Sequence, residues 1–137
     1  MDLLLLADEQ ESMVNKYLHR GELFALFDND LKTVSVVTQE NEEIYEIKNI
    51  ATYEKYQGKG YGSIMIKYII ENIKNKGKRL LVGTGESDEI IAFYKNFGFE
   101  YSHTIEDFFV DNYDHKMYEN GKQLKDMIYL KIDFESV

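Results

Sequence analysis

The spacing of hydrophobic residues predicts helices in three parts of the chain. In residues 61–76 the apolar side chains recur every three or four positions, which places them on one face of a helix: Tyr61, Ile64, Met65, Tyr68, Ile69 and Ile73. Gly77 follows, as is common where a helix ends. A shorter helix is expected over residues 90–97, which Gly98 follows, and one or two short helices over residues 3–18.

Strands are expected between and after these helices. Residues 22–27 and 33–38 flank an Asp-Asn-Asp turn, so they predict an antiparallel hairpin. Residues 44–51 alternate loosely in polarity and predict a third strand. The next strand, expected over residues 80–82, would run parallel to the third and complete a strand, helix, strand unit. The chain is extended again from residue 99, a final strand is expected over 128–134, and residues 108–118 are aromatic but irregular.

The composition is that of one folded domain. The chain has 137 residues, of which 44% are hydrophobic, and its 11 tyrosines and 8 phenylalanines can each bury a large area. It has no cysteine, which excludes disulfides, thiolate nucleophiles and zinc sites built on sulfur, and this fits a reducing cytoplasm. Because no apolar run is long enough to span a bilayer, no membrane partner is expected.

The net charge indicates which kinds of binding partner are expected. With 16 basic and 25 acidic side chains the chain carries a charge of −9, whereas affinity for nucleic acid comes largely from lysine and arginine. No nucleic-acid partner is therefore expected, and a cationic ligand is easier to accommodate, although net charge reports mainly on solubility. The three histidines share no metal-ligand spacing, so no metal site is expected: His19, His103 and His115.

A glycine-rich loop, Gln-Gly-Lys-Gly-Tyr-Gly at residues 57–62, lies between the third strand and the long helix. The start of a helix offers unpaired backbone N–H groups and a partial positive charge, so a glycine-rich entry allows a pyrophosphate to approach, and Lys59 adds a cation. The loop is not a dinucleotide fingerprint, because Ser63 stands where glycine or alanine is needed. It is not a P-loop either, because Gly60 follows Lys59.

The loop resembles the acetyl-CoA signature of the GNAT superfamily of N-acetyltransferases, through Gln57, Gly60 and Gly62. A second family motif, Tyr-x-x-x-Gly-Phe, is matched by Tyr94, Gly98 and Phe99. The resemblance covers roughly residues 21–134. It implies a mixed, mostly antiparallel central sheet flanked by helices, an α/β fold in which a splayed strand pair holds acetyl-CoA. It also implies a single N-acetyltransferase domain over residues 1–137, with the first family strand missing or displaced.

The resemblance further implies which residues bind acetyl-CoA, the co-substrate. The strand before the loop would offer backbone groups to the pantetheine arm, and the loop would hold the pyrophosphate. Ser87 stands where the family commonly has asparagine, and Glu86 beside it is an acid that could repel phosphate. The expected cofactor-binding residues are Ile50, Ala51, Thr52, Gln57, Gly58, Lys59, Gly60, Tyr61, Gly62, Ser63, Ser87 and Tyr94.

Two catalytic residues are implied in the same way. Tyr94 would be the general acid that protonates the departing thiolate, and the alternative is a tyrosine packed in the core. Glu46 would be the general base that takes a proton from the acceptor ammonium. On an alternating strand it would share a face with Lys48 and Ile50, so a cross-strand ion pair is the alternative for Glu46.

The implied function is direct transfer of an acetyl group from acetyl-CoA to a primary amine of a small molecule or peptide. Acids alternate with aromatic residues over residues 107–114, which could receive a cationic amine or form a solvated loop. Two other readings stay open: an acyl-CoA sensor without turnover, and a domain that binds another phosphate ligand. The sequence favours a monomer or homodimer and leaves the acceptor amine unidentified.

Overall fold

The structure is a computed structural model that describes residues 21–119 and 122–134. The predicted helices in residues 3–18 and the fate of the first family strand lie outside the described residues. The described residues form two compact units, which are described one at a time: residues 21–80 together with Phe134, and residues 81–119 together with 122–133. Within the described ranges, no helix has both the length and the apolar character needed to cross a membrane.

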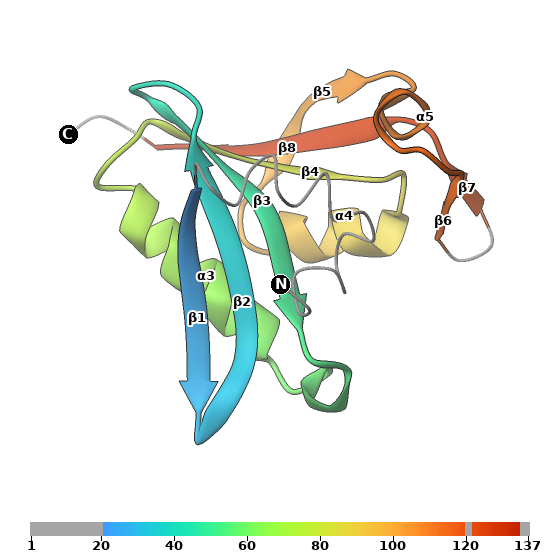
Figure 1. Ribbon diagram of the computed structural model, residues 1–137. Coiled ribbons are helices and arrows are strands. Elements are labelled where there is room, and N and C mark those ends of the chain that lie inside the picture. Colours follow the sequence, from blue (N-terminus) through green and yellow to red (C-terminus); the bar gives the residue numbers. More distant parts are fainter. Residues whose placement is uncertain (1–20, 120–121, 135–137) are drawn as a thin grey trace. The chain divides into compact units, whose positions relative to one another are not determined.

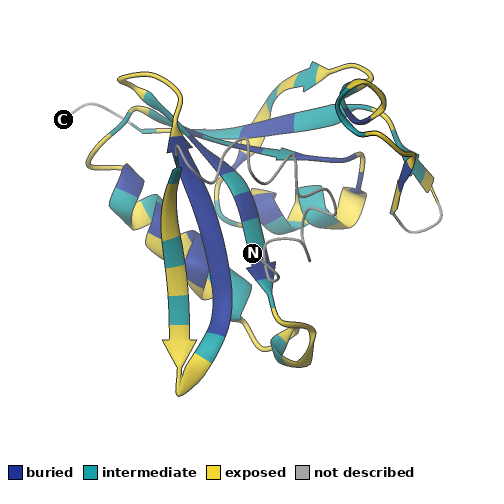
Figure 2. Ribbon diagram, viewed as in Figure 1, coloured by how far each residue is buried: buried dark blue, intermediate teal, exposed yellow. Residues whose placement is uncertain are grey.

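The first unit begins with an antiparallel meander of three strands, β1 (Gly21–Asp28), β2 (Asp30–Gln39) and β3 (Ile44–Thr52) (Figure 1). Asn29 forms the turn between β1 and β2 with a φ of 70°, a left-handed conformation that asparagine tolerates better than most residues. Figure 2 shows that β2 is buried along most of its length, whereas β1 alternates between exposed and partly exposed residues. The predicted hairpin and third strand are confirmed.

A β-bulge interrupts the alternation of side chains along β3. Glu46 pairs with Thr38 and Ile47 with Val37, but the next residue of β2 pairs with Asn49, so Lys48 is the extra residue. Beyond the bulge, the side chains of β3 therefore change faces. The prediction that Glu46 and Ile50 share a face is wrong for this reason: Asn49, and not Ile50, lies on the face of Glu46.

The long helix, α3 (Tyr61–Ile73), packs against β2 and β3, and four of its residues are buried: Met65, Ile66, Ile69 and Ile73 (Figure 1). The predicted apolar face is confirmed only in part, because Ile64 and Tyr68 are exposed and Ile66 is buried instead. It ends three residues before the predicted end, because the N–H groups of Lys76 and Gly77 both donate to the Ile73 carbonyl, at 2.8 and 2.9 Å, and close a turn there. At Gly77 a Cβ would lie 2.7 Å from a ring carbon of Tyr45, so the ring occupies the space of a side chain.

The strand after α3, β4 (Arg79–Thr84), starts next to the beginning of β3. The N–H groups of Lys78 and Arg79 donate to the Glu43 carbonyl, at 2.7 and 3.1 Å, just before β3 starts. This arrangement agrees with the predicted strand, helix, strand unit. The strand is longer than the predicted residues 80–82.

In the second unit the strand order is β4, then β8 (Met127–Asp133), then β5 (Glu100–Ile105), and β5 pairs antiparallel with β8. Helix α4 (Asp88–Lys95) lies two residues earlier than predicted. The segment predicted to be irregular contains a short helix and one strand of a hairpin, so that prediction is wrong: α5 (Phe108–Asn112), β6 (Met117–Glu119) and its partner β7 (Lys122–Leu124). The predicted α/β fold with a mostly antiparallel sheet is confirmed.

Candidate active site

The glycine loop follows a 3-10 turn, η1 (Glu54–Tyr56), and leads directly into α3. Gly58 and Gly60 have φ values of 76° and 88°, a left-handed region that residues with a Cβ rarely adopt. A Cβ on either glycine would meet nothing within 4 Å, so it is the backbone conformation, and not crowding, that favours glycine at both positions. The loop backbone is therefore open to close approach.

The first turn of α3 is suited to an anion. Gly60 is the N-cap and supplies no side-chain acceptor, so the first N–H groups of the helix have no capping side chain. The first turn also carries no acidic residue, which leaves the positive end of the helix dipole without a competing carboxylate. Lys59, on the exposed part of the loop, adds a positive charge. This turn and loop contain the residues predicted to hold pyrophosphate.

Two predicted loop residues are engaged with the end of β3. The Gln57 side-chain amide donates to the Thr52 carbonyl at 3.0 Å, so the glutamine fastens the start of the loop to the strand. The Thr52 hydroxyl is 2.8 Å from the Thr33 hydroxyl of β2. A Cβ on Gly62 would lie 3.9 Å from the Thr52 hydroxyl, so the start of α3 lies against the end of β3. The structure thus brings Thr52, Gln57 and Gly62 together.

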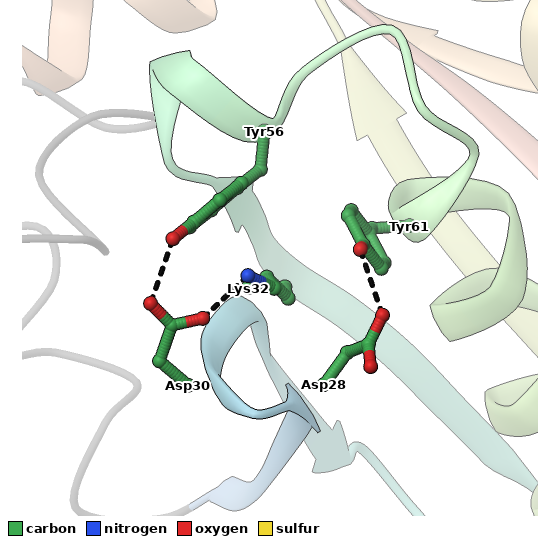
Figure 3. Close-up of polar contacts among 5 residues, drawn as sticks. All are labelled: Asp28, Asp30, Lys32, Tyr56 and Tyr61. Carbon is green, nitrogen blue, oxygen red and sulfur yellow. Dashed lines mark hydrogen bonds and ion pairs between the residues drawn. The ribbon is translucent and has the colours of Figure 1, made fainter.

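Beside the loop lies a cluster of five polar residues that the sequence did not predict (Figure 3). The Tyr56 hydroxyl donates to Asp30 at 2.7 Å, and the Tyr61 hydroxyl donates to Asp28 at 2.9 Å. Lys32 forms an ion pair with Asp30, and its ammonium lies 3.4 Å from the centre of the Tyr56 ring. The two hydrogen-bonded pairs join residues that are 26 and 33 positions apart in sequence. Neither the Asp-Asn-Asp turn nor the sequence around the tyrosines therefore indicated these contacts.

The contacts of this cluster shift the pKa values of Asp30, Lys32 and Tyr61. The hydrogen bond from Lys32, and then that from Tyr56, lower the pKa of the Asp30 carboxyl. Burial acts to lower the pKa of Lys32, but the bonds to Asp30 and Tyr56 outweigh it, so that pKa is raised. The hydrogen bond to Asp28, and next burial, raise the pKa of Tyr61. Each of these three shifts favours the protonation state that the group already has at neutral pH.

Glu46 lies on β3 and is buried, with 7% of its surface exposed. Its carboxylate is 2.8 Å from the Lys48 ammonium, which also lies 3.0 Å from Glu40 in the turn that follows β2. The Glu46–Lys48 pair lies within one strand, between residues two positions apart. The Glu40–Lys48 contact is the one that links two segments. The other predicted residues on β3, Ile50 and Ala51, pair with Ser35 and Val34 of β2.

Tyr94 lies in the second unit, on α4, and is 6% exposed. Its ring makes edge-to-face contacts with Phe93 and Phe99, at centroid distances of 5.3 and 5.5 Å. Burial raises the pKa of the Tyr94 phenol to about 12. The side chain thus packs in an aromatic core, and its role as the general acid stays a prediction.

Ser87 has a structural role that the sequence did not predict. It is the N-cap of α4, and its hydroxyl accepts a hydrogen bond from the Ile90 N–H at 3.4 Å, which explains why the helix starts at Asp88. The neighbouring Glu86 lies 3.7 Å from the Lys122 ammonium, so its negative charge is partly offset. In the same unit Asp107 has a φ of 54°, and its N–H donates to Asp126 at 2.9 Å.

Comparison with known proteins identifies the family of this chain. The family described as the acetyltransferase (GNAT) domain matches residues 19–101. An uncharacterized N-acetyltransferase of Bacillus subtilis strain 168, YvbK, is 38% identical over 135 residues, which are 96% of this chain and 87% of the relative.

Two solved structures are also similar to this chain. A GNAT family acetyltransferase from Elizabethkingia anophelis with acetyl-CoA bound is 38% identical, with a TM-score of 0.92 over 97% of this chain and 89% of the other. A Bacillus subtilis acetyltransferase in complex with CoA is 36% identical, with a TM-score of 0.90 over 98% of this chain and 90% of the other. The extent of these matches shows that the chain belongs to the GNAT family of acetyl-CoA-dependent N-acetyltransferases.

Proposed function

We propose that this protein transfers the acetyl group of acetyl-CoA directly to a primary amine of a small molecule or peptide. The observation that carries the proposal is the entry to α3, where two left-handed glycines open the backbone and the first turn of the helix carries no acidic side chain. The backbone N–H groups of residues 58–63 bind the pyrophosphate, with Lys59 beside them. Ile50, Ala51 and Thr52 offer backbone groups to the pantetheine arm.

Two residues transfer the protons that this reaction requires. Glu46 accepts a proton from the acceptor ammonium, and the neutral amine then attacks the thioester carbonyl carbon. The new C–N bond forms as the C–S bond breaks, and the CoA thiolate takes a proton from Tyr94. The attacking nitrogen then releases its second proton, which restores the Tyr94 phenol, and Glu46 returns its proton to water. The products are an N-acetyl amine and CoA. Tyr94 is assigned by its place in the family motif, and Glu46 by its burial and its position on β3.

We propose that residues 107–114 receive the acceptor amine. Residues 107–114 carry both acidic and aromatic side chains around α5, and the rings of Phe109 and Tyr113 stack at 5.6 Å. This combination suits a cationic amine, through charge and ring faces together. The Ser87 hydroxyl oxygen accepts the capping hydrogen bond of α4, and its hydrogen can donate to the cofactor.

A thiol-release screen tests the proposed function. Acetyl-CoA is offered with polyamines, aminoglycosides, amino acids and short peptides, and free CoA is measured with and without protein. Thermal shifts with acetyl-CoA and with ATP run in parallel. The proposal predicts that acetyl-CoA raises the melting temperature and at least one amine class releases CoA.

The two other readings predict different outcomes. An acyl-CoA sensor is stabilised by acetyl-CoA but releases no CoA with any amine class. A site for another phosphate ligand is stabilised by ATP and not by acetyl-CoA. Either result contradicts the proposed transfer.

A further inference from the structure

Two tyrosines bracket the glycine loop, and both are tied to the same tight turn. Tyr56 is the last residue of η1, immediately before Gln57, and Tyr61 is the first residue of α3, immediately after Gly60. Figure 3 shows their hydroxyl groups pointing to the two ends of the β1–β2 turn, where Tyr56 bonds to Asp30 and Tyr61 to Asp28. Both ends of the loop are therefore fastened to one short segment.

The turn that receives them is itself well fixed. Asp28 and Asp30 face each other as the last pair of the β1–β2 ladder. Lys32, which is 7% exposed, pairs with Asp30 and lies under the Tyr56 ring, and the two tyrosine rings meet edge to face at 6.2 Å. Because Lys32 offsets the charge of Asp30, an acidic turn can lie next to a loop that receives phosphate.

The loop needs such an attachment because of its glycines. A backbone with left-handed glycines at 58 and 60 has more conformations to lose than an ordinary loop, and ordering it on binding would weaken affinity. Holding both ends in place before the ligand arrives removes part of that loss. The hydroxyl groups of Tyr56 and Tyr61 are used in the attachment, so they act on the cofactor through the loop backbone.

We propose that Tyr56 and Tyr61 are positioning residues, whose hydrogen bonds to Asp30 and Asp28 hold the glycine loop in the conformation that binds the pyrophosphate of acetyl-CoA. The inference rests on the proposed role of residues 57–62 in binding acetyl-CoA. It gives the β1–β2 turn a function in cofactor affinity, although the turn supplies no group to the cofactor.

The test measures CoA binding by calorimetry and acetyl-CoA kinetics in hydroxyl-deletion variants. Tyr56→Phe and Tyr61→Phe each keep the ring and lose one hydrogen bond, so each should raise the Kd for CoA and the KM for acetyl-CoA about five-fold. The kcat at saturating acetyl-CoA and the KM for the amine should not change. Tyr53→Phe is the matched control, because it removes a hydroxyl from an exposed tyrosine just before η1 and should leave the Kd unchanged.

A double-mutant cycle shows whether the Tyr61–Asp28 bond itself is responsible. Asp28→Ala should weaken CoA binding as much as Tyr61→Phe, and the double variant should be no weaker than either alone. Asp28→Asn, which keeps an acceptor oxygen, should restore most of the affinity. Additive losses, or an equal fall in kcat with a lower melting temperature in every variant, would show a merely structural role and overturn the proposal.

Gly60→Ala separates this inference from the proposed function, since it strains the loop directly. If Gly60→Ala weakens CoA binding while the tyrosine and aspartate variants bind normally, the loop assignment stands and the positioning role is wrong. If the unmodified protein binds no CoA, the loop assignment fails, and the positioning role fails with it.

Discussion

Glu46 and Glu40 both contact the Lys48 ammonium, at 2.8 and 3.0 Å, and they differ in burial and in the segment that carries them. If Glu46 served only as an ion-pair partner, neutralising either carboxylate would have a similar effect. If Glu46 is the general base, the two variants must differ in catalysis. This pair of residues therefore allows a matched comparison.

Glu46→Gln is expected to lower kcat about 100-fold or more, because the acceptor ammonium loses its proton acceptor. Glu40→Gln should keep kcat within about two-fold, since an exposed or partly exposed ion pair contributes little. Steady-state kinetics with saturating acetyl-CoA and the best amine from the screen provide the measurement. Equal losses in the two variants would assign Glu46 to the ion pair alone.

Tyr94→Phe should lower kcat about 100-fold while the aromatic core stays packed, because only the proton donor is removed. Tyr68→Phe, on the exposed side of α3, should have no effect and serves as the control. With its pKa raised to about 12, the Tyr94 phenol stays protonated as the pH rises, so its loss of a proton should produce no alkaline limb in kcat below about pH 10. A Tyr94→Phe variant with full kcat would contradict the assignment.

At the scale of elements, the sequence predicted the helices and turns that can be recognised within a short stretch of residues. The apolar stripe of α3 and the Asp-Asn-Asp turn were both recognisable, and the elements formed where expected. The ends differed where one or two hydrogen bonds decide: the Ile73 carbonyl accepts the two closing bonds of α3, and Ser87 caps α4. Periodicity carries no information about such contacts.

The bulge at Lys48 and the cluster around Tyr56 could not be predicted from the sequence. A bulge is fixed by the register between two strands, and β3 reads as an ordinary alternating strand without its partner. The glycine loop was identified because its function needs a short local pattern. The turn that fastens it, at Asp28 and Asp30, lies in a different part of the chain and became apparent only in three dimensions.

Gly77→Ala tests the packing where α3 leads into β4. The new Cβ would lie 2.7 Å from the Tyr45 ring and 3.0 Å from the Glu43 carbonyl, and neither neighbour can move easily. We expect a loss of about 1–3 kcal/mol in the free energy of unfolding, measured by urea denaturation.

Gly83→Ala is the comparison, because its Cβ would come closest to the flexible end of Met127, 2.8 Å away at the sulfur, while a Tyr129 ring carbon lies farther away, at 3.2 Å. The loss there should be smaller, since a methionine side chain can change rotamer. An equal loss in the two variants would show that the rigid Tyr45 ring is not the cause.

At the scale of the whole molecule, we propose that residues 1–137 act as a single acetyltransferase domain. Thermal unfolding followed by circular dichroism and by tyrosine fluorescence should then give one coincident transition. Saturating CoA should raise the midpoint of that whole transition, because only the folded state binds it. Two separate transitions, of which CoA shifts only one, would contradict the single-domain proposal.

The most direct test of the account follows the acetyl group itself. Acetyl-CoA with an isotopically labelled acetyl group is incubated with the protein and the amine selected by the screen, and the amine is analysed by mass spectrometry while free thiol is titrated. We predict one labelled N-acetyl group on the amine for each CoA released, and neither product without the protein. Binding of acetyl-CoA with no labelled amine from any acceptor class would contradict the central claim.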